Sequence, residues 1–309
     1  MITIIDLQGF DEKYHLAILR YQLILSNHKT LIVKKYVLAT DFSENSIAAL
    51  KYAHEFSRKT NAELWVINVF NKPSFSSNIV DPYYFTSAES IVKIKNQIKE
   101  MCIEYIGSAT NIKTEAIDHS PVSSALISKA TEINASLIIT GMKGKNPLNE
   151  LLIGSTTLNL IHKSPIPLLT IPSNNLTNNF ENIIYATDFE KEDVFAILNL
   201  IEIIKPLTPT IKVTHISTKK EYKGQDQMEW FKEILLQKVT YPNLEFYLFF
   251  SEDIYETLQK FSEEVNADVI VMLERNKKDI LRTILHQDLV KKMKNSSTIP
   301  LLSFNEKYC

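Results

Sequence analysis

Three glycines stand close together in a chain that otherwise uses very little glycine. The 309 residues include 6 glycines, where average usage of about 7% would give roughly 22. Gly141, Gly144 and Gly154 share one short segment. Glycine lets a ligand approach the backbone closely and adopts conformations that other residues avoid. Since the rest of the chain can turn with Asn, Ser, Asp and Pro, this cluster needs a reason of its own.

The segment has the composition of an anion-binding loop that leads into a helix. Ser155 and Thr156 follow Gly154 at the start of a predicted helix. A helix N-terminus presents unpaired N–H groups and a positive dipole end, and hydroxyls add donors. Lys143 or Lys145 can bring a positive charge to a phosphate. The spacing is neither that of a P-loop nor that of GxGxxG. The residues alone leave open the alternative that the glycines make a turn and Ser155 caps the helix.

The chain repeats itself, which predicts a duplicated domain. The segment 39–42 (ATDF) recurs at 186–189, and 166–169 (IPLL) recurs at 299–302. Asn134-Ala135, followed by an apolar run, recurs as Asn266-Ala267 between those two matches. The predicted organisation is an N-terminal extension over 1–33, a first domain over 34–172, a polar linker over 173–180 and a second domain over 181–309.

Each repeat reads as alternating strands and helices, which is typical of an α/β fold with a parallel sheet and helices on both faces. In the first repeat we expect strands at 36–40, 64–69, 114–117, 137–140 and 166–170, with helices after Ser43 and at 88–107, 122–133 and 155–163. In the second we expect strands at 182–187, 211–216, 244–249, 268–272 and 299–303, with helices at 191–204, 226–238, 253–265 and 285–294. Ligands of open parallel sheets bind beyond the carboxyl ends of the strands.

The first repeat resembles the universal stress protein family. ATP-binding members of that family carry Gly, two residues, Gly, nine residues, Gly, and then Ser or Thr, and 141–155 meets this spacing. The segments 40–43 (TDFS), 68–69 (NV) and 164–168 (SPIPL) also resemble the family. The resemblance covers nearly all of 34–304. It implies two tandem, open, parallel-sheet domains of the Rossmann-like, adenine nucleotide alpha-hydrolase-like type.

The resemblance also implies a set of site residues. They are Ala39, Thr40, Asp41, Val69, Gly141, Lys143, Gly144, Gly154, Ser155 and Thr156. The first three would contact the nucleoside, and the Val69 backbone would pair with the adenine edge. Gly141 and Gly144 would pass close to the ribose and phosphates. Gly154, Ser155 and Thr156 would cradle the phosphates. Lys143 stands where some members carry His. The implied cofactor is ATP, AMP or ADP, with Mg²⁺ arriving on the phosphates rather than in a protein cage.

The second repeat lacks the glycines of the first. With Asn134 aligned on Asn266, the positions of Gly141, Gly144, Gly154 and Ser155 hold Leu273, Asn276, His286 and Gln287. Larger side chains would fill the space of a phosphate, so we expect no ATP in this domain. The family pairs such domains through their last strands, which implies that 166–170 and 299–303 join within one chain as a pseudo-dimer. A further homodimer is compatible with this.

Composition excludes several other functions. A formal charge of −2 argues against nucleic-acid binding. No apolar run reaches membrane-spanning length, and the acidic N-terminus does not read as a signal peptide. Two cysteines suit a reducing compartment, and neither CxxC nor a Cys/His cluster suggests a metal site. We therefore expect a cytoplasmic protein whose partner is an adenine nucleotide.

Catalysis is not expected to be the main role, although slow ATP hydrolysis stays open. Nothing in the glycine segment supplies a general base or an arginine finger. An adenylyl transferase would need a HxGH motif or a Ser-Gly-Gly loop after the first strand, and neither is present. A nucleotide-free interaction module of the same fold remains as the alternative. The family often has Gly after the third strand where this chain has 119–121 (HSP), and the loop 71–87 can be a lid or a partner surface.

Overall fold

The computed structural model describes residues 33–71, 87–142, 154–174, 179–218, 224–274 and 299–306. Every element described below belongs to the unit Lys34–Cys309. Several sequence-based expectations therefore lie outside the described residues. They are the extension over 1–32, most of the loop 71–87, Lys143, Gly144 and the helix near 285–294.

The first half alternates strands and helices in the predicted order. Its elements are β1 (Lys35–Ala39), α2 (Glu44–Thr60), β2 (Glu63–Phe70), α3 (Ser87–Ile106), β3 (Ile112–Asp118), α4 (Val122–Glu132), β4 (Leu137–Met142), α5 (Ser155–Lys163) and β5 (Leu168–Pro172). The second half follows with β6 (Asn182–Ala186), α6 (Lys191–Ile204), β7 (Thr210–Ser217), α7 (Gly224–Lys238), β8 (Leu244–Phe250), α8 (Ile254–Glu264), β9 (Val269–Glu274) and β10 (Leu301–Asn305).

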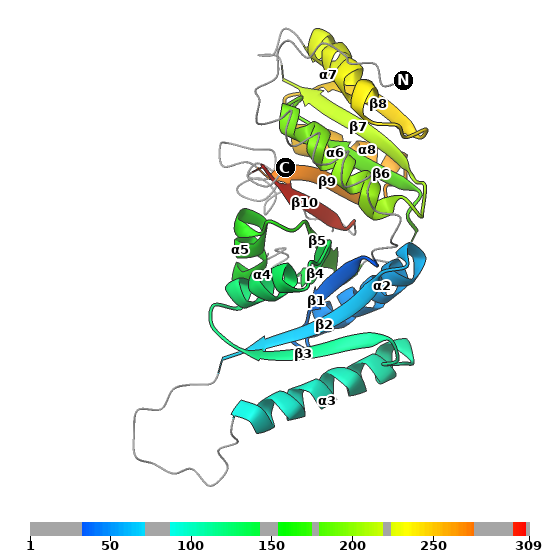
Figure 1. The fold of residues 1–309 in the computed structure, drawn as a ribbon. Coiled ribbons are helices and arrows are strands. Elements are labelled where there is room, and N and C mark those ends of the chain that lie inside the picture. The colour runs from blue at the N-terminus through cyan, green and yellow to red at the C-terminus, as the bar shows by residue number, and fades with distance from the viewer. Residues whose placement is uncertain are drawn as a thin grey trace, which may run out of the picture. The chain divides into compact units, whose positions relative to one another are not determined.

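All ten strands form one sheet in the order β3-β2-β1-β4-β5-β10-β9-β6-β7-β8 (Figure 1). Within each half the neighbouring strands are parallel. In the first half the chain turns outward from β1 to β2 and β3, and then crosses to β4 on the other side of β1. The strand order therefore reverses between β1 and β4, which is where open parallel sheets place their ligands.

The buried strands explain the two-faced sheet. In β1, Tyr36 and Leu38 pack into the core beneath α2, whereas Val37 packs with Leu126 and Leu160 of α4 and α5. Successive side chains of a strand point to opposite faces, so a run in which every residue is apolar requires cover on both sides. Helices α4 and α5 thus lie on the face of β1 opposite to α2.

Helix α2 begins where the sequence predicts. The Ser43 side chain accepts a hydrogen bond from the Ser46 N–H and caps the helix. At the other end Asn61 takes the left-handed conformation with φ 52°, as C-terminal caps commonly do.

Two strands begin two residues later than predicted. We expected the fifth strand at 166–170 and the last at 299–303, but β5 begins at Leu168 and β10 at Leu301. The reason is proline, which has no N–H to donate and sits at strand starts. Pro167 and Pro300 only accept, from Ile138 and Ile270 respectively.

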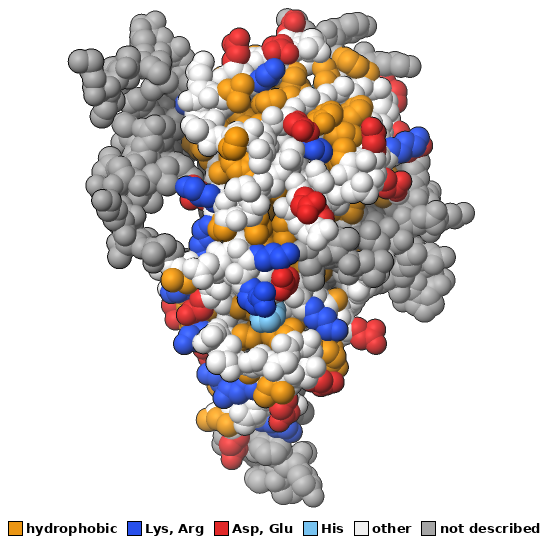
Figure 2. Space-filling view, turned by 90° about the vertical axis from the view of Figure 1, so that its right-hand side faces the viewer, with side chains coloured by type: hydrophobic (Ala, Val, Ile, Leu, Met, Phe, Trp, Pro, Cys, Tyr) orange, Lys and Arg blue, Asp and Glu red, His pale blue; other side chains and the backbone are white. Residues whose placement is uncertain are grey.

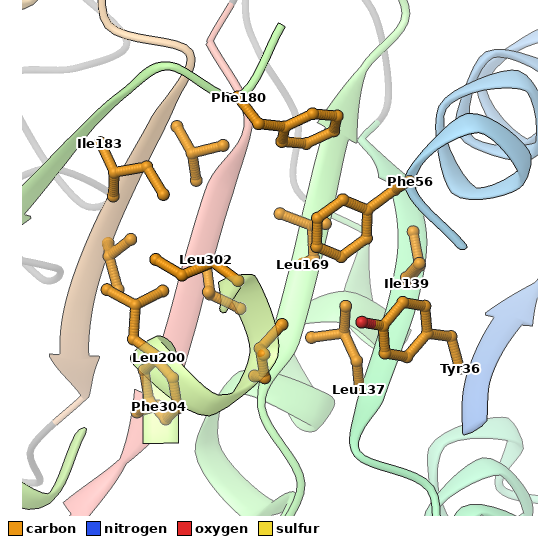
Figure 3. Packing of buried hydrophobic residues seen from close by; sticks show 14 of the residues in the cluster. Tyr36, Phe56, Leu137, Ile139, Leu169, Phe180, Ile183, Leu200, Leu302 and Phe304 are labelled. Carbon is orange, nitrogen blue, oxygen red and sulfur yellow. The ribbon is translucent and has the colours of Figure 1, made fainter. Parts of the chain in front are cut away.

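The two halves join edge to edge through β5 and β10, which pair antiparallel. Thr170 lies opposite Leu301, and the Thr170 hydroxyl donates to the Leu301 carbonyl at 3.2 Å. One apolar core continues across the join, with Phe56 and Phe180 at a ring-centroid distance of 4.7 Å (Figure 3). Since the strands of the two halves run in opposite directions, their carboxyl ends lie at opposite edges of the sheet.

Helix α5 also contacts the second half. The His162 Nδ1 lies 2.9 Å from Oε1 of Glu274 at the end of β9. The Asn305 side chain on β10 donates to the Ile161 carbonyl at 3.1 Å. The last turn of α5 is therefore fixed to the second half, while its first turn lies at the carboxyl edge of the first.

The surface carries charges of both signs. Figure 2 shows acidic, basic and hydrophobic side chains interspersed on one face, in keeping with a net charge of −2. Within the described part of the chain, no helix has both the length and the apolar character that crossing a membrane requires.

Candidate functional site

A cavity of about 200 Å³ lies at the carboxyl ends of β1, β2 and β4, where the strand order reverses. Its apolar wall comes from Ile67 of β2 and from Val122 and Leu126 of α4. Polar residues at the ends of β1 and β4 and in the first turn of α5 complete it. The cavity thus combines an apolar side with a polar side, as small-molecule sites do.

The cavity brings together six of the ten predicted site residues. These are Ala39, Thr40, Asp41, Val69, Gly141 and Thr156. Gly154 and Ser155 immediately precede Thr156 at the start of α5. Lys143 and Gly144 lie outside the described residues, so their roles stay predictions.

Asp41 is held by the residues that follow it. The Ser43 N–H donates to Asp41 Oδ1 at 3.1 Å and the Ser43 hydroxyl at 2.5 Å. Partial burial by itself raises the pKa of this carboxyl, but the hydrogen bonds from Ser43 and the Ser46 side chain outweigh it and leave the pKa below its ordinary value. The group is therefore a carboxylate at neutral pH and can accept hydrogen bonds from a ligand.

The backbone around Asp41 is fixed from β2 and α2. The Asn68 side chain donates to the Thr40 carbonyl at 2.8 Å. The Thr40 hydroxyl donates to the Ser46 hydroxyl at 3.0 Å. These bonds tie the end of β1 to β2 and α2, and they position the Asp41 side chain at the cavity.

Gly141 is required by close packing of the backbone. A Cβ at this position would lie 2.4 Å from the Asn45 carbonyl oxygen in the first turn of α2. That contact cannot be relieved by moving a side chain, because the neighbour is backbone. Gly141 therefore lets β4 approach α2 at the mouth of the cavity, and the cluster of glycines is not explained by a turn alone.

Gly154 has the opposite surroundings. It occupies the N-cap of α5 with φ −65° and ψ 153°, and a Cβ built there would meet no atom of the described residues within 4 Å. The alternative that Ser155 caps the helix is wrong, because Ser155 is its first helical residue. The first N–H groups of a helix have no partner within the helix, and those of α5 begin beside the open space at Gly154.

Thr140 is a polar residue of the cavity that the sequence analysis missed. It lies on β4 beside Gly141 and is 5% exposed. Its hydroxyl is buried and has no hydrogen-bond partner among the residues that the structure describes. Asn45, Ser46 and Thr157 also line the cavity. The signal for Thr140 was a polar residue at the end of an otherwise apolar strand.

The residues after β3, where the family often has Gly, lie at two different places. Val122 of α4 lines the cavity, whereas His119 lines a separate hollow with Glu115, Lys129 and Glu132. The described ranges contain no group of three His, Cys, Asp or Glu that could hold a metal.

A comparison with family models decides what this arrangement belongs to. Residues 33–172 match the model of the Universal stress protein family. The first half of the chain is a universal stress protein domain. The family model spans β1 to β5, so the domain that it describes is the half of the chain that contains the cavity.

Relatives agree with this assignment. A universal stress protein of Staphylococcus saprophyticus is 27% identical over 169 residues, which are 52% of this chain and 97% of the relative. One from Staphylococcus aureus is 26% identical over 164 residues, with 52% of this chain and 96% of the relative covered. The crystal structure of a universal stress protein from Archaeoglobus fulgidus superposes with a TM-score of 0.64 at 22% identity, over 88% of this chain and 98% of that one. It shows that this fold extends through both halves.

The second half of the chain repeats the local geometry of the first, but different side chains fill the corresponding positions. Phe42 and Phe189 both have φ 63° after the strand-end Asp. Where Asn68 holds the Thr40 carbonyl, His215 Nδ1 lies 2.7 Å from the Thr187 carbonyl. The His215 ring also packs on Phe189 at a centroid distance of 4.2 Å.

A buried carboxylate stands in the second half where the first has a serine. Asp193, at the position of Ser46, is 0% exposed. It accepts hydrogen bonds from the Tyr185 hydroxyl at 2.8 Å and the Thr187 hydroxyl at 2.9 Å. Leu273, at the position of Gly141, is buried in the core. The end of β6 is thus packed with protein groups at positions that border a cavity in the first half.

Proposed function

We propose that the first half of the chain binds ATP, or the related AMP or ADP, in the cavity between β1, β2, β4 and the start of α5. The observation that carries the proposal is the cavity itself, at the strand-order reversal, with Asp41 and, from the first turn of α5, Thr156 among its lining residues. A sequence pattern of the family's ATP-binding members, carried by 141–155, supports the choice of ligand.

The walls of the cavity suggest how the nucleotide would lie. The base would rest on the apolar side, near Val69 and Leu126. The ribose would lie near Asp41, because carboxylates accept hydrogen bonds from sugar hydroxyls. The phosphates would reach the first turn of α5, where N–H groups and the helix dipole favour anions. The volume of about 200 Å³ is below the 300–1,000 Å³ typical of ligand sites, so the described walls would enclose only part of the nucleotide.

The proposed role is sensing or regulation in a stress response rather than rapid turnover. Asp41 is the one charged residue among the described lining residues. Because its pKa is lowered, it is a weak base at neutral pH. We further propose that the second half binds no ATP in this mode and that it covers the β5 edge of the first half.

The proposal is tested with the full chain. Purified protein is denatured, and the supernatant is chromatographed for adenine nucleotide. Separately, protein from which any bound nucleotide has been removed is titrated with ATP, ADP and AMP by calorimetry. We expect binding in the micromolar range or tighter at one site per chain. Absence of nucleotide together with absence of binding would leave the nucleotide-free interaction module as the function.

Gly154 offers a variant that separates binding from folding. Gly154→Ala and Gly154→Val add one and three carbons where the described residues leave space, so each should cost about 1 kcal/mol of stability, the usual penalty for a poorer N-cap. The added carbons would lie at the start of α5, where the phosphates would approach, so affinity for ATP should fall with the added volume. A Gly154→Val protein that binds ATP as well as the wild type does would show that the phosphates lie elsewhere.

A further inference from the structure

The Thr140 hydroxyl is the least satisfied polar group of the cavity. It is buried and has no partner within the described part of the chain. Two nearby threonines differ from it. The Thr170 hydroxyl, across from Thr140 in the β4–β5 register, donates to the Leu301 carbonyl at 3.2 Å. The Thr40 hydroxyl donates to Ser46 at 3.0 Å.

A hydroxyl in this state destabilises the ligand-free fold. Burial removes its hydrogen bonds to water, and a missing protein partner leaves that loss uncompensated. Valine has nearly the same shape and would remove the penalty. Buried polar groups without partners are uncommon in native proteins, and each one calls for a reason.

The position of Thr140 supplies a reason. Its side chain lies on the face of the sheet covered by α4 and α5, as do the side chains of Ala39 and Val69, and all three line the cavity. Rotation about χ1 exchanges the hydroxyl and the methyl group among staggered positions, so the hydroxyl can turn to meet a bound molecule. A ligand in the cavity can therefore provide the missing partner.

We infer that Thr140 is a specificity-determining residue whose hydroxyl hydrogen-bonds the ribose of the bound nucleotide. This inference rests on the proposed function. Thr140 lies on β4 next to β1, opposite Ala39 in the register, and therefore between Val69 on β2 and the first turn of α5. The Asp41 carboxylate at the end of β1 repels a phosphate from this part of the cavity and attracts a sugar hydroxyl.

The experiment compares Thr140→Val with Thr170→Val in the full chain. Each protein is titrated with ATP, 2′-deoxyATP, 3′-deoxyATP and inorganic triphosphate, and its unfolding is followed in urea without ligand. For Thr140→Val we expect a higher urea midpoint and an affinity for ATP lower by about ten-fold, the loss of one hydrogen bond to a buried group. The wild type should prefer ATP to at least one deoxy analogue, and Thr140→Val should lose that preference while binding triphosphate unchanged.

The matched control should behave in the opposite way. Thr170→Val removes a hydroxyl that has a partner and lies outside the cavity, so it should lower the urea midpoint and leave ATP affinity intact. The inference is overturned if the wild type prefers ATP to neither deoxy analogue, if Thr140→Val binds ATP as the wild type does or keeps the wild-type preference, or if it weakens triphosphate binding equally. If the wild type itself binds no adenine nucleotide, the proposed function falls and this inference falls with it, which the first titration alone reveals.

Discussion

Single side chains at the end of β1 set the electrostatic character of the cavity. Asp41 accepts hydrogen bonds from the Ser43 N–H and the Ser43 hydroxyl. The same hydroxyl caps α2. One serine therefore caps a helix and also helps to lower the pKa of the carboxyl two residues before it.

Removing the Ser43 hydroxyl should raise the pKa of Asp41. The pKa lies below its ordinary value of 3.8 in the folded protein, so the carboxylate stabilises the fold above that pH and loses this contribution as the pH falls through the lowered pKa. In Ser43→Ala the loss should occur at a higher pH. Carboxyl ¹³C shifts of Asp41 followed by NMR from pH 7 to pH 2 measure the change.

A matched variant guards against a general effect of losing the helix cap. Asp253→Ala removes the cap of α8 and should destabilise the protein to a similar degree while leaving the Asp41 titration where it is. If Ser43→Ala leaves the Asp41 pKa unchanged, the hydrogen bonds from Ser43 are not what lowers it.

Residue patterns predict the site where spacing is local and miss it where the fold brings distant segments together. Asp41, Val69 and Gly141 could be placed because each ends a strand. Asn45 and Ser46 could not, because they reach the cavity only through the approach of α2 to β4. Thr140 needed the structure for another reason, since only burial reveals that its hydroxyl has no described partner.

At the scale of elements, two glycines of the same motif have different structural roles. Gly141 lets β4 approach the first turn of α2, where a Cβ would lie 2.4 Å from a backbone oxygen. Gly154 is the N-cap of α5, and no atom of the described residues lies within 4 Å of a Cβ built there. Gly141 is therefore needed for close packing, whereas Gly154 leaves space beside the start of α5 among the described residues.

Gly141→Ala should therefore destabilise the chain more than Gly154→Ala does. Overpacking against a backbone that cannot yield costs typically 1–3 kcal/mol, so we expect about 2 kcal/mol or more for Gly141→Ala, compared with about 1 kcal/mol for Gly154→Ala. Urea unfolding of both full-length variants measures the difference. Equal losses would show that α2 can shift away from β4 at little cost.

Element types and their order follow well from the sequence, and boundaries follow where the chain has strong local signals. Helix α6 spans Lys191–Ile204 as predicted, and β3 extends beyond the predicted 114–117 to Ile112–Asp118. The start of β5 was misplaced because an apolar run that contains Pro167 looks like a strand from its first residue. Its register with β10 depends on contacts between the two halves and has no local signal.

For the whole molecule, the decisive contact is the antiparallel pairing of β5 with β10, the two segments that the repeats had singled out. It removes two strand edges that would otherwise be exposed. It also continues the core from Phe56 to Phe304 across the join (Figure 3). The ten-stranded sheet therefore needs both halves to be complete.

A chain truncated to residues 1–172 should self-associate. Removing the second half uncovers the β5 edge and apolar residues such as Leu169, and a second copy of β5 can pair there antiparallel as β10 does. We expect a dimer in light scattering coupled to size-exclusion chromatography. Leu169→Lys in the truncated chain should reduce the dimer, because a buried lysine opposes burial of that edge, whereas Lys113→Glu on the distant edge strand β3 should not. A truncated chain that stays folded and monomeric would contradict the expectation.

Because β5 and β10 pair within one chain, the amino-acid sequences of the two halves can change independently. In a dimer of identical chains every substitution enters both copies, so a residue that fills one pocket fills the other as well. Here Gly141 lets β4 approach α2 beside the cavity of the first half, while Leu273 packs into the core of the second half. In a single chain each half can change without the other. The same sheet can therefore have a cavity at the carboxyl ends of the strands of one half and packed side chains at those of the other half.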